Sequence, residues 1–300
     1  MRLASGNGEN MDKIIRAVNK EGTLRAFVAE TTVIANEAVK IHDTYPVVTA
    51  ALGRLMTACL MMGQTLKEEQ EALSLQIKGD GPIGSIVTVS NMRGHVRGYV
   101  GNNHIQLPSN AKGKLDVGGG VGKGFLTVIR DLKLKEPYIG RTDLQTGEIA
   151  EDIAYYYQVS EQVPSAVSLG VLVDVDGSVL ASGGFLVQLM PGASEEVMAQ
   201  LEQNLQNLTP ISTLIYEGNT PQDVLAKVLG GMDYTITDQV DPVYQCNCSR
   251  ERLAGVLASL GQEELQDMIE TDGKAEMVCH FCAGKYLFNK EQIQDILRNC

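Results

Sequence analysis

Four of the six cysteines lie in two close pairs near the end of the chain. Cys246 and Cys248 are one residue apart, and Cys279 and Cys282 follow about thirty residues later with two residues between them. Two pairs of thiolates, joined by a spacer that can fold back, fit the tetrahedral all-cysteine sites that hold structural Zn²⁺. The spacing therefore predicts one zinc ion bound by Cys246, Cys248, Cys279 and Cys282.

The same cysteines could instead be buried or disulfide-bonded without a metal. The Cys-x-Cys spacing is shorter than the usual Cys-x2-Cys knuckle and places two thiols one residue apart. Thiols released from a metal at this spacing can pair, and a ring so short is strained and more easily reduced than a structural disulfide. A reversible redox switch is therefore a further hypothesis. His280 lies inside the second pair, but four cysteines leave no need for it as a ligand.

The composition excludes several classes of protein. The chain has 300 residues, 44% of them hydrophobic and 21% charged, which allows one large or two to three modest domains with a sizeable core. A formal net charge of −12 argues against a nucleic-acid partner, because phosphate contacts need clusters of Lys and Arg. The longest apolar run, 55–62, is far shorter than the roughly 20 residues of a membrane-spanning helix, so we expect no membrane.

Cysteines of the metal-binding type without a secretion signal indicate a reducing cytoplasm. Residues 1–10 are small and polar, and we interpret them as an added leader before Met11.

Residues 11–191 are expected to form an α+β core, with a mixed sheet and flanking helices. Alternating patterns predict strands over 23–29, 73–78, 86–89, 95–100, 124–129, 166–175 and 178–189. Helices are predicted over 32–41, 46–62 and 149–161. Cys59 falls within the second of these helices, where we expect a small core residue. His42, His95 and His104 are scattered and are expected to be surface or capping residues, so no catalytic site and no enzyme activity are predicted.

Two glycine-rich segments resemble nucleotide-binding loops without meeting their requirements. Segment 79–84 reads Gly-x-Gly-x-x-Gly, but a strand pattern follows where a dinucleotide site needs a helix, so we predict a hairpin turn. Segment 118–124 has Val117 in place of the first glycine of a phosphate loop. It also has Gly124 in place of the Ser or Thr that would hold Mg²⁺.

The character of the sequence changes after Pro191. Residues 192–234 carry apolar stripes at helical spacing, and helices this short are marginal alone, so this helical linker must dock on the core. Its docking could be lost. Residues 235–300 are expected to form a small C-terminal zinc-binding redox-switch domain. Its thin core of roughly 60 residues would depend on the metal to fold.

Several of these motifs together resemble the bacterial redox-regulated heat-shock holdases of about thirty-three kilodaltons. They are the Cys-x-Cys followed by Ser-Arg-Glu-Arg at 249–252, the Cys-His-Phe-Cys knuckle at 279–282, and the segments 81–84, 160–165 and 183–191. The resemblance spans residues 11–300. Cys59 and Cys300 lie outside the pattern and receive no role.

This resemblance implies that the reduced protein binds one Zn²⁺ on Cys246, Cys248, Cys279 and Cys282 and is inactive. Oxidation would form the disulfides Cys246–Cys248 and Cys279–Cys282, release zinc, and unfold the linker and the zinc domain. The exposed surface would then bind unfolding client proteins without ATP, as a homodimer, and protect them from aggregation under oxidative stress.

Two other classes of protein remain as alternatives. A thiol-disulfide oxidoreductase would use Cys279 and Cys282 catalytically, but such enzymes place Cys-x-x-Cys at a helix start beside a βαβ pattern and need no second pair. A zinc-ribbon adaptor would keep its zinc under oxidants. A nucleic-acid module would show a basic face, which the acidic composition does not favour.

Overall fold

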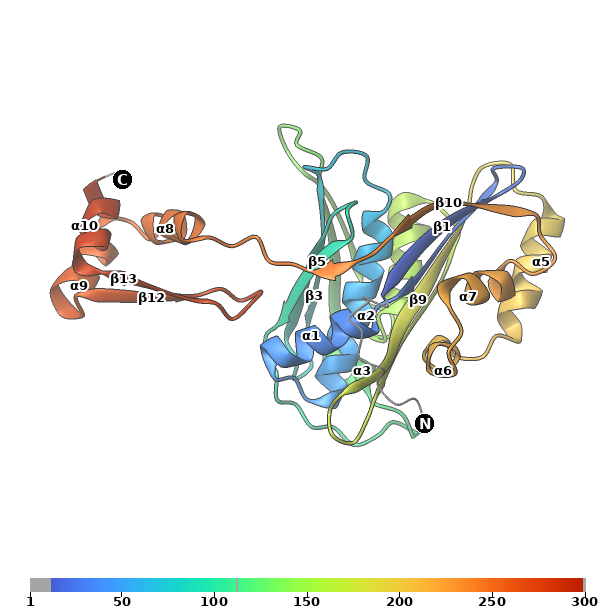
Figure 1. Ribbon diagram of the computed structural model, residues 1–300, viewed down its shortest axis with the longest axis horizontal. Coiled ribbons are helices and arrows are strands. Elements are labelled where there is room, and N and C mark those ends of the chain that lie inside the picture. Colours follow the sequence, from blue (N-terminus) through green and yellow to red (C-terminus); the bar gives the residue numbers. More distant parts are fainter. Residues whose placement is uncertain (1–11, 112, 299–300) are drawn as a thin grey trace. The chain divides into compact units, whose positions relative to one another are not determined.

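The computed structural model describes residues 12–111 and 113–298, which separate into two compact units (Figure 1). The first unit ends at Tyr244 and the second begins at Gln245. The sequence placed this boundary near residue 235, about ten residues too early, because β10 (Tyr234–Val240) pairs with β1 (Lys13–Asn19) and belongs to the first unit. The leader interpretation of 1–10 and the terminal Cys300 lie outside the described residues.

The first unit is built on two sheets. One has five strands in the order β10-β1-β2-β9-β8, with β2 (Leu24–Glu30), β9 (Val179–Leu189) and β8 (Ser165–Val173). Its central strands are buried on both faces: Phe27 and Leu186 point into one apolar cluster, while Val28 and Val187 point into another. Layers on both faces explain why β2 and β9 read as nearly continuous apolar runs.

The second sheet has six strands in the order β11-β5-β4-β3-β6-β7. Their bounds are β11 (Val243–Tyr244), β5 (His95–Val100), β4 (Ser85–Ser90), β3 (Ala72–Gly79), β6 (Gly124–Asp131) and β7 (Tyr138–Asp143). Strands β4 and β5 alternate strictly between buried and half-buried residues, as expected for an antiparallel sheet with one face on the core. The strands predicted over 73–78, 86–89, 95–100 and 124–129 are confirmed.

Helix α2 (Pro46–Gly63) packs against strands of both sheets and is buried on all sides (Figure 1). It is long and apolar enough to cross a membrane, but 89% of this stretch is buried inside the protein, as for a core helix. Cys59 is fully buried on it, which confirms a core position, and burial raises the pKa of its thiol to about 11. Helix α1 (Thr32–His42) precedes α2.

One of the three histidine predictions needs correction. His42, at the end of α1, is buried, and its Nε2 lies 3.1 Å from the Tyr244 hydroxyl of β11. It is a core residue because a partner two hundred residues away in the sequence covers it. His95 is half-buried, and His104 is exposed beside Asp43 at 3.0 Å.

The two glycine-rich segments hydrogen-bond to each other. The Gly81 N–H donates to the Val121 carbonyl at 3.0 Å, and the Ile83 N–H donates to the Gly120 carbonyl at 3.0 Å. A Cβ on Gly79 would lie 1.9 Å from the Val121 carbonyl oxygen, so glycine is required there for close backbone approach. Segment 79–84 is the β3–β4 turn, and 117–121 forms the short helix α3 (Val117–Val121). These backbone groups hold two turns together.

The helix predicted over 149–161 is present in two parts. Helix α4 (Ala150–Tyr156) continues as a π-helical turn, η1 (Tyr157–Glu161). Asp152 is buried at the start of α4, and its carboxylate accepts hydrogen bonds from the backbone N–H groups of Gln145 at 2.7 Å and Ile149 at 2.9 Å. The preceding loop is therefore tightly fixed.

Three short helices cover the remaining face of the five-stranded sheet. They are α5 (Glu195–Gln206), α6 (Ile211–Tyr216) and α7 (Pro221–Val228), and they appear beside β9 and β1 in Figure 1. Helices α6 and α7 contact the sheet directly, while α5 packs on α7. The Asn204 side chain of α5 donates to the carbonyls of Val228 at 3.0 Å and Gly230 at 2.9 Å. These helices thus form an outer layer of the first unit.

Candidate metal centre

The second unit is small and has little apolar core. It contains α8 (Arg250–Ala258), α9 (Gln262–Thr271), the hairpin β12 (Lys274–Val278) with β13 (Lys285–Asn289), and α10 (Lys290–Arg298). Its buried apolar side chains are Leu257, Leu265, Ile269, Phe288 and Ile293. At about 2 kcal/mol each, burial of these five side chains contributes about 10 kcal/mol, which is little for a unit of this length.

The β12–β13 hairpin positions the second cysteine pair. Val278 pairs with Lys285, and the turn between them carries both cysteines. The Ala283 N–H donates to the Cys279 carbonyl at 2.8 Å, and the Cys279 N–H donates to the Gly284 carbonyl at 2.9 Å. Ala283 has a φ of +55°, the left-handed conformation that closes such a turn. The turn fixes the backbone around the two thiols.

The first cysteine pair lies in the segment before α8. The Ser249 side chain accepts a hydrogen bond from the Arg252 N–H at 3.3 Å and caps this helix. The Arg252 side chain donates to the carbonyl of Asn247, between the two cysteines, at 3.1 Å. Arg250 donates to the Leu287 carbonyl at 2.9 Å and lies 4.9 Å from the centre of the Phe288 ring. The Ser-Arg-Glu-Arg segment therefore ties the first pair to the hairpin that carries the second.

The four sulfur atoms meet in one cluster. All lie within 4.8 Å of one another, with 3.7 Å between Cys246 and Cys279 and 3.3 Å between Cys248 and Cys282. A tetrahedral ion with bonds of about 2.3 Å separates its sulfur ligands by about 3.8 Å. The donor set and its spacing therefore fit one tetrahedral, thiophilic ion such as Zn²⁺. His280 is not part of the cluster of ligand atoms found among the described residues.

The surroundings make the four thiols unequal. The Tyr286 hydroxyl, 3.2 Å from the Cys248 sulfur, stabilises its thiolate and lowers the pKa of Cys248 to about 7. Burial raises the pKa of Cys246 to about 12, and burial also raises the pKa of Cys282. In the absence of a metal, Cys248 therefore loses its proton before Cys246 and Cys282 do. A bound cation would favour the thiolate form of all four.

Tyr286 was not identified from the sequence, and Arg250 was noted only as part of the Ser-Arg-Glu-Arg motif, without a role at this centre. Tyr286 lies on β13 and Arg250 lies at the start of α8. A tyrosine four residues after Cys282 and an arginine two residues after Cys248 are the available signals, and neither has meaning before the hairpin is known. The structure also weakens one alternative, because Cys279 and Cys282 occupy a β-hairpin turn and not a helix start.

Known proteins resemble the chain over nearly its whole length. The sequence profile of the Hsp33 protein family matches residues 12–289. The 33 kDa chaperonin of Desulforamulus reducens is 50% identical over 287 residues, covering 96% of this chain and 97% of the relative. That of Acetivibrio thermocellus is also 50% identical over 287 residues, covering 96% of each chain. The crystal structure of the 33 kDa chaperonin of Thermotoga maritima superposes with a TM-score of 0.89 at 38% identity, covering 96% of this chain and 98% of that one. By sequence and by fold, the chain belongs to the Hsp33 family of chaperones.

Proposed function

We propose that this protein is a redox-regulated, ATP-independent holdase. In the reduced state the four clustered cysteines bind one Zn²⁺ and the protein is inactive. Oxidation turns the cysteines into two disulfides and releases the metal, and the protein then binds unfolding clients. The observation that supports this proposal most directly is the cluster of four sulfurs within 4.8 Å, set in a unit with a thin core.

The coupling between oxidation and unfolding follows from the energetics of the second unit. A structural zinc site contributes an apparent 10 to 16 kcal/mol to folding in small domains, which is comparable to the whole apolar burial of this unit. Each disulfide formed gives two electrons to one molecule of peroxide and consumes two of the thiolates that the metal requires. The unit therefore loses its main stabilising contribution when it is oxidised.

The pairing of the disulfides decides the outcome. A bond from Cys246 to Cys279 or from Cys248 to Cys282 would cross-link the segment before α8 to the hairpin and keep the unit closed. Bonds within the pairs, Cys246–Cys248 and Cys279–Cys282, leave the two segments free to separate. A switch that works by unfolding therefore requires disulfides within the pairs, although sulfur atoms of different pairs also lie only 3.7 and 3.3 Å apart.

The second part of the switch is the layer formed by α5, α6 and α7. These helices have 12, 6 and 8 residues, too few to be stable in water without the sheet beneath them. We infer that unfolding of the second unit favours their release, and that the uncovered apolar face binds clients. The protein is proposed to act in the cytoplasm as a homodimer, without catalytic activity and without nucleic-acid or membrane partners.

Zinc content and client aggregation, measured on one sample before and after peroxide with mild heat, test this proposal. Reduced, zinc-loaded protein should leave a heat-unfolded enzyme to aggregate, while oxidised, zinc-free protein should prevent it. Thiol reductant with zinc should reverse the change. Equal suppression by both forms, or none by the oxidised form, would sink the proposal.

Two further measurements separate the parts of the mechanism. Peptide mapping of the oxidised protein should show disulfides within each pair, and bonds between the pairs would overturn unfolding as the mechanism. Cys300→Ser, which changes a cysteine outside both pairs, is the matched control and should leave zinc binding and the switch unchanged.

A further inference from the structure

Strand β8 forms one edge of the five-stranded sheet, and within the described part of the chain β9 is its only partner strand. The Leu189 N–H donates to the Pro164 carbonyl at 3.0 Å, which fixes the alternation of the antiparallel ladder. Even-numbered residues from 166 to 172 therefore direct their backbone groups to β9. Odd-numbered residues from 165 to 171 direct theirs away from the sheet.

These outward backbone groups form an unused row, here called the β8 edge and centred on Val167 and Leu169. Across residues 12–111 and 113–298, no hydrogen bond engages the backbone N–H of either residue. Every residue of β8 except Gly170 and Val171 is half-buried, so the strand is partly open to solvent. An unpaired strand edge is a template for another extended chain.

A cavity of about 600 Å³ opens along this edge. Residues 167–169 form one wall, and residues 110–111, 114–119 and 146–151 form the others. This volume lies within the range of about 300 to 1,000 Å³ that is typical of ligand pockets. The walls carry charges of both signs: Arg54 and Lys114 are basic, and Asp116, Glu148 and Glu151 are acidic. The cavity can therefore accept polar groups of either sign and selects no single charge.

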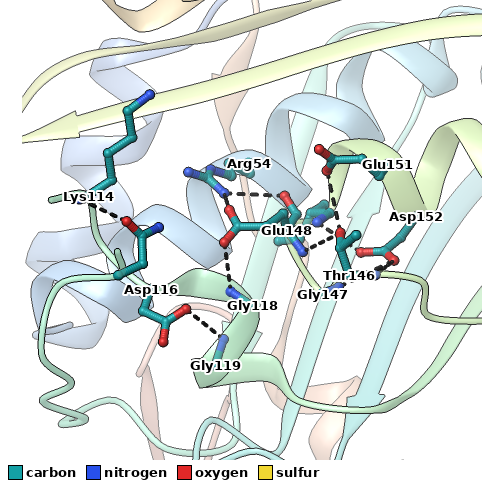
Figure 2. A network of polar contacts seen from close by, with 12 residues as sticks. Arg54, Lys114, Asp116, Gly118, Gly119, Thr146, Gly147, Glu148, Glu151 and Asp152 are labelled. Atoms are coloured by element: carbon teal, nitrogen blue, oxygen red, sulfur yellow. Dashed lines mark hydrogen bonds and ion pairs between the residues drawn. The ribbon is translucent and has the colours of Figure 1, made fainter. Parts of the chain in front are cut away.

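The cavity is held open by a fixed polar network (Figure 2). Arg54 of α2 donates to the Glu148 carboxylate at 2.6 Å, and the other oxygen of this carboxylate accepts from the Gly118 N–H at 3.1 Å. Ile149 has a φ of +75°, a strained conformation for a β-branched residue, and the buried Asp152 carboxylate holds its N–H. A wall built this way is preorganised, so little ordering is required when a ligand binds.

An extended polypeptide is the occupant that fits both features. Its backbone would pair with the N–H and C=O groups of Val167 and Leu169, and its side chains opposite these residues would enter the cavity. Main-chain pairing gives affinity with little dependence on sequence, which suits a protein that binds many unfolding clients. A second copy of the chain fits less well, because its own residues 114–119 and 146–151 would meet the walls of the cavity.

The outer layer of helices limits this pairing. Side chains of an added strand alternate between faces, so those opposite Ser168 and Gly170 would point toward α6. Helix α6 covers that face closely: a Cβ on Gly170 would lie 2.9 Å from both Ile211 and Ser212. Release of α6 would therefore lengthen the available edge and place an apolar face beside it.

We propose that the β8 edge and its cavity bind an extended segment of the client by β-strand addition, weakly while α6 is docked and tightly once it is released. This inference rests on the proposed holdase function and identifies the surface at which the client would bind.

The probe is a fluorescent hexapeptide of alternating Thr and Val with blocked ends, titrated into the oxidised protein. Val167→Pro and Leu169→Pro each remove one outward N–H without breaking the β8–β9 ladder, a position where edge strands tolerate proline. We expect each to weaken peptide binding at least tenfold. The matched control is Ile139→Pro, which removes an outward N–H from the edge strand β7 of the other sheet and should not change binding.

Two measurements on the unaltered protein decide the question even if a proline variant fails to fold. Hydrogen exchange should show new protection of the Val167 and Leu169 amides when the peptide binds. The same peptide N-methylated at alternate residues on its pairing edge should bind at least tenfold more weakly. Unchanged exchange at both amides, or equal binding of the methylated peptide, would overturn the proposal.

The remaining outcomes are also decisive. Protection of Val167 and Leu169 that grows with protein concentration and without peptide would assign the edge to a second copy and refute the client assignment. Zinc release by peroxide should be unchanged in Val167→Pro while suppression of client aggregation falls. If the unaltered oxidised protein does not suppress aggregation at all, the holdase function fails, whereas normal suppression by both proline variants refutes only the β8 edge.

Discussion

Replacing Leu225 with alanine should release the helical layer without oxidation. Leu225 lies at the centre of α7 and is fully buried against the five-stranded sheet, in a cluster with Val224 and Val228. A buried Leu→Ala change reduces stability by about 2 to 5 kcal/mol, because apolar contacts are lost and a cavity remains. At about 3 kcal/mol, the equilibrium for opening of the layer rises roughly a hundredfold.

Native-state hydrogen exchange of the reduced, zinc-loaded protein measures this opening directly. Amides of α5, α6 and α7 should exchange about a hundredfold faster in Leu225→Ala, while the central strand β9 keeps its protection. The variant should also suppress client aggregation in part while reduced. The matched control is Lys227→Ala on the exposed side of the same helix, where a surface change is worth within about 0.5 kcal/mol. If β9 loses as much protection as α7 does, the helices open only when the whole unit unfolds. The hypothesis that α5, α6 and α7 leave a folded sheet would then be wrong.

Three other changes test separate parts of the molecule. Cys248→Ser should weaken zinc binding at least tenfold in competition with a colorimetric chelator, and unchanged affinity would remove this residue from the centre. Asn204→Ala removes the donors to Val228 and Gly230 and should lower the opening free energy of α5 to α7 by about 1 to 3 kcal/mol, read by the same exchange experiment. Burial raises the pKa of Asp12 from 3.8 to about 7, so the native state retains a proton that the unfolded chain loses. This contribution to stability is complete below pH 3.8 and is lost as pH rises to about 7. The unaltered protein therefore loses stability over this interval, and Asp12→Asn does not. The free energy of unfolding of Asp12→Asn, minus that of the unaltered protein, should rise by up to about 4 kcal/mol between pH 3.8 and about 7. A difference that does not vary with pH would contradict the burial argument.

The sequence predicted best the elements whose burial is one-sided. Buried and less buried residues alternate along strands β3, β4 and β5, because one face of the sheet packs on α2 and the other is open. This alternation can be recognised in the sequence without a structure. The metal site could also be predicted from the sequence, because two close pairs of cysteines can bind a single ion whatever fold the residues between them adopt. Their meeting within 4.8 Å agrees with that expectation.

The sequence and the structure begin the last unit at different residues, and the difference has a physical reason. Strand β10 is exposed along nearly its whole length, and its apolar alternation stops after Ile236, so the pattern is too short to mark a strand. It joins the sheet through backbone pairing with β1, from which it is separated by more than two hundred residues. Pairing through backbone hydrogen bonds does not require a particular order of apolar and polar side chains, so the sequence does not reveal it. The hairpin β12–β13 escaped prediction similarly, since only Phe288 among its residues is fully buried there.

The architecture explains how a protein can lose a layer and remain folded. The five-stranded sheet is held on one face by α2 and the six-stranded sheet, which form the larger apolar cluster. On the other face it is held by three short helices over Ile15, Val28 and Phe185. Removing the helices exposes these side chains but leaves the contacts with α2 intact. The uncovered face would then be the apolar side of a sheet with an open edge at β8. A surface of this kind binds extended apolar chains, and the same helices that cover it would control when it is available.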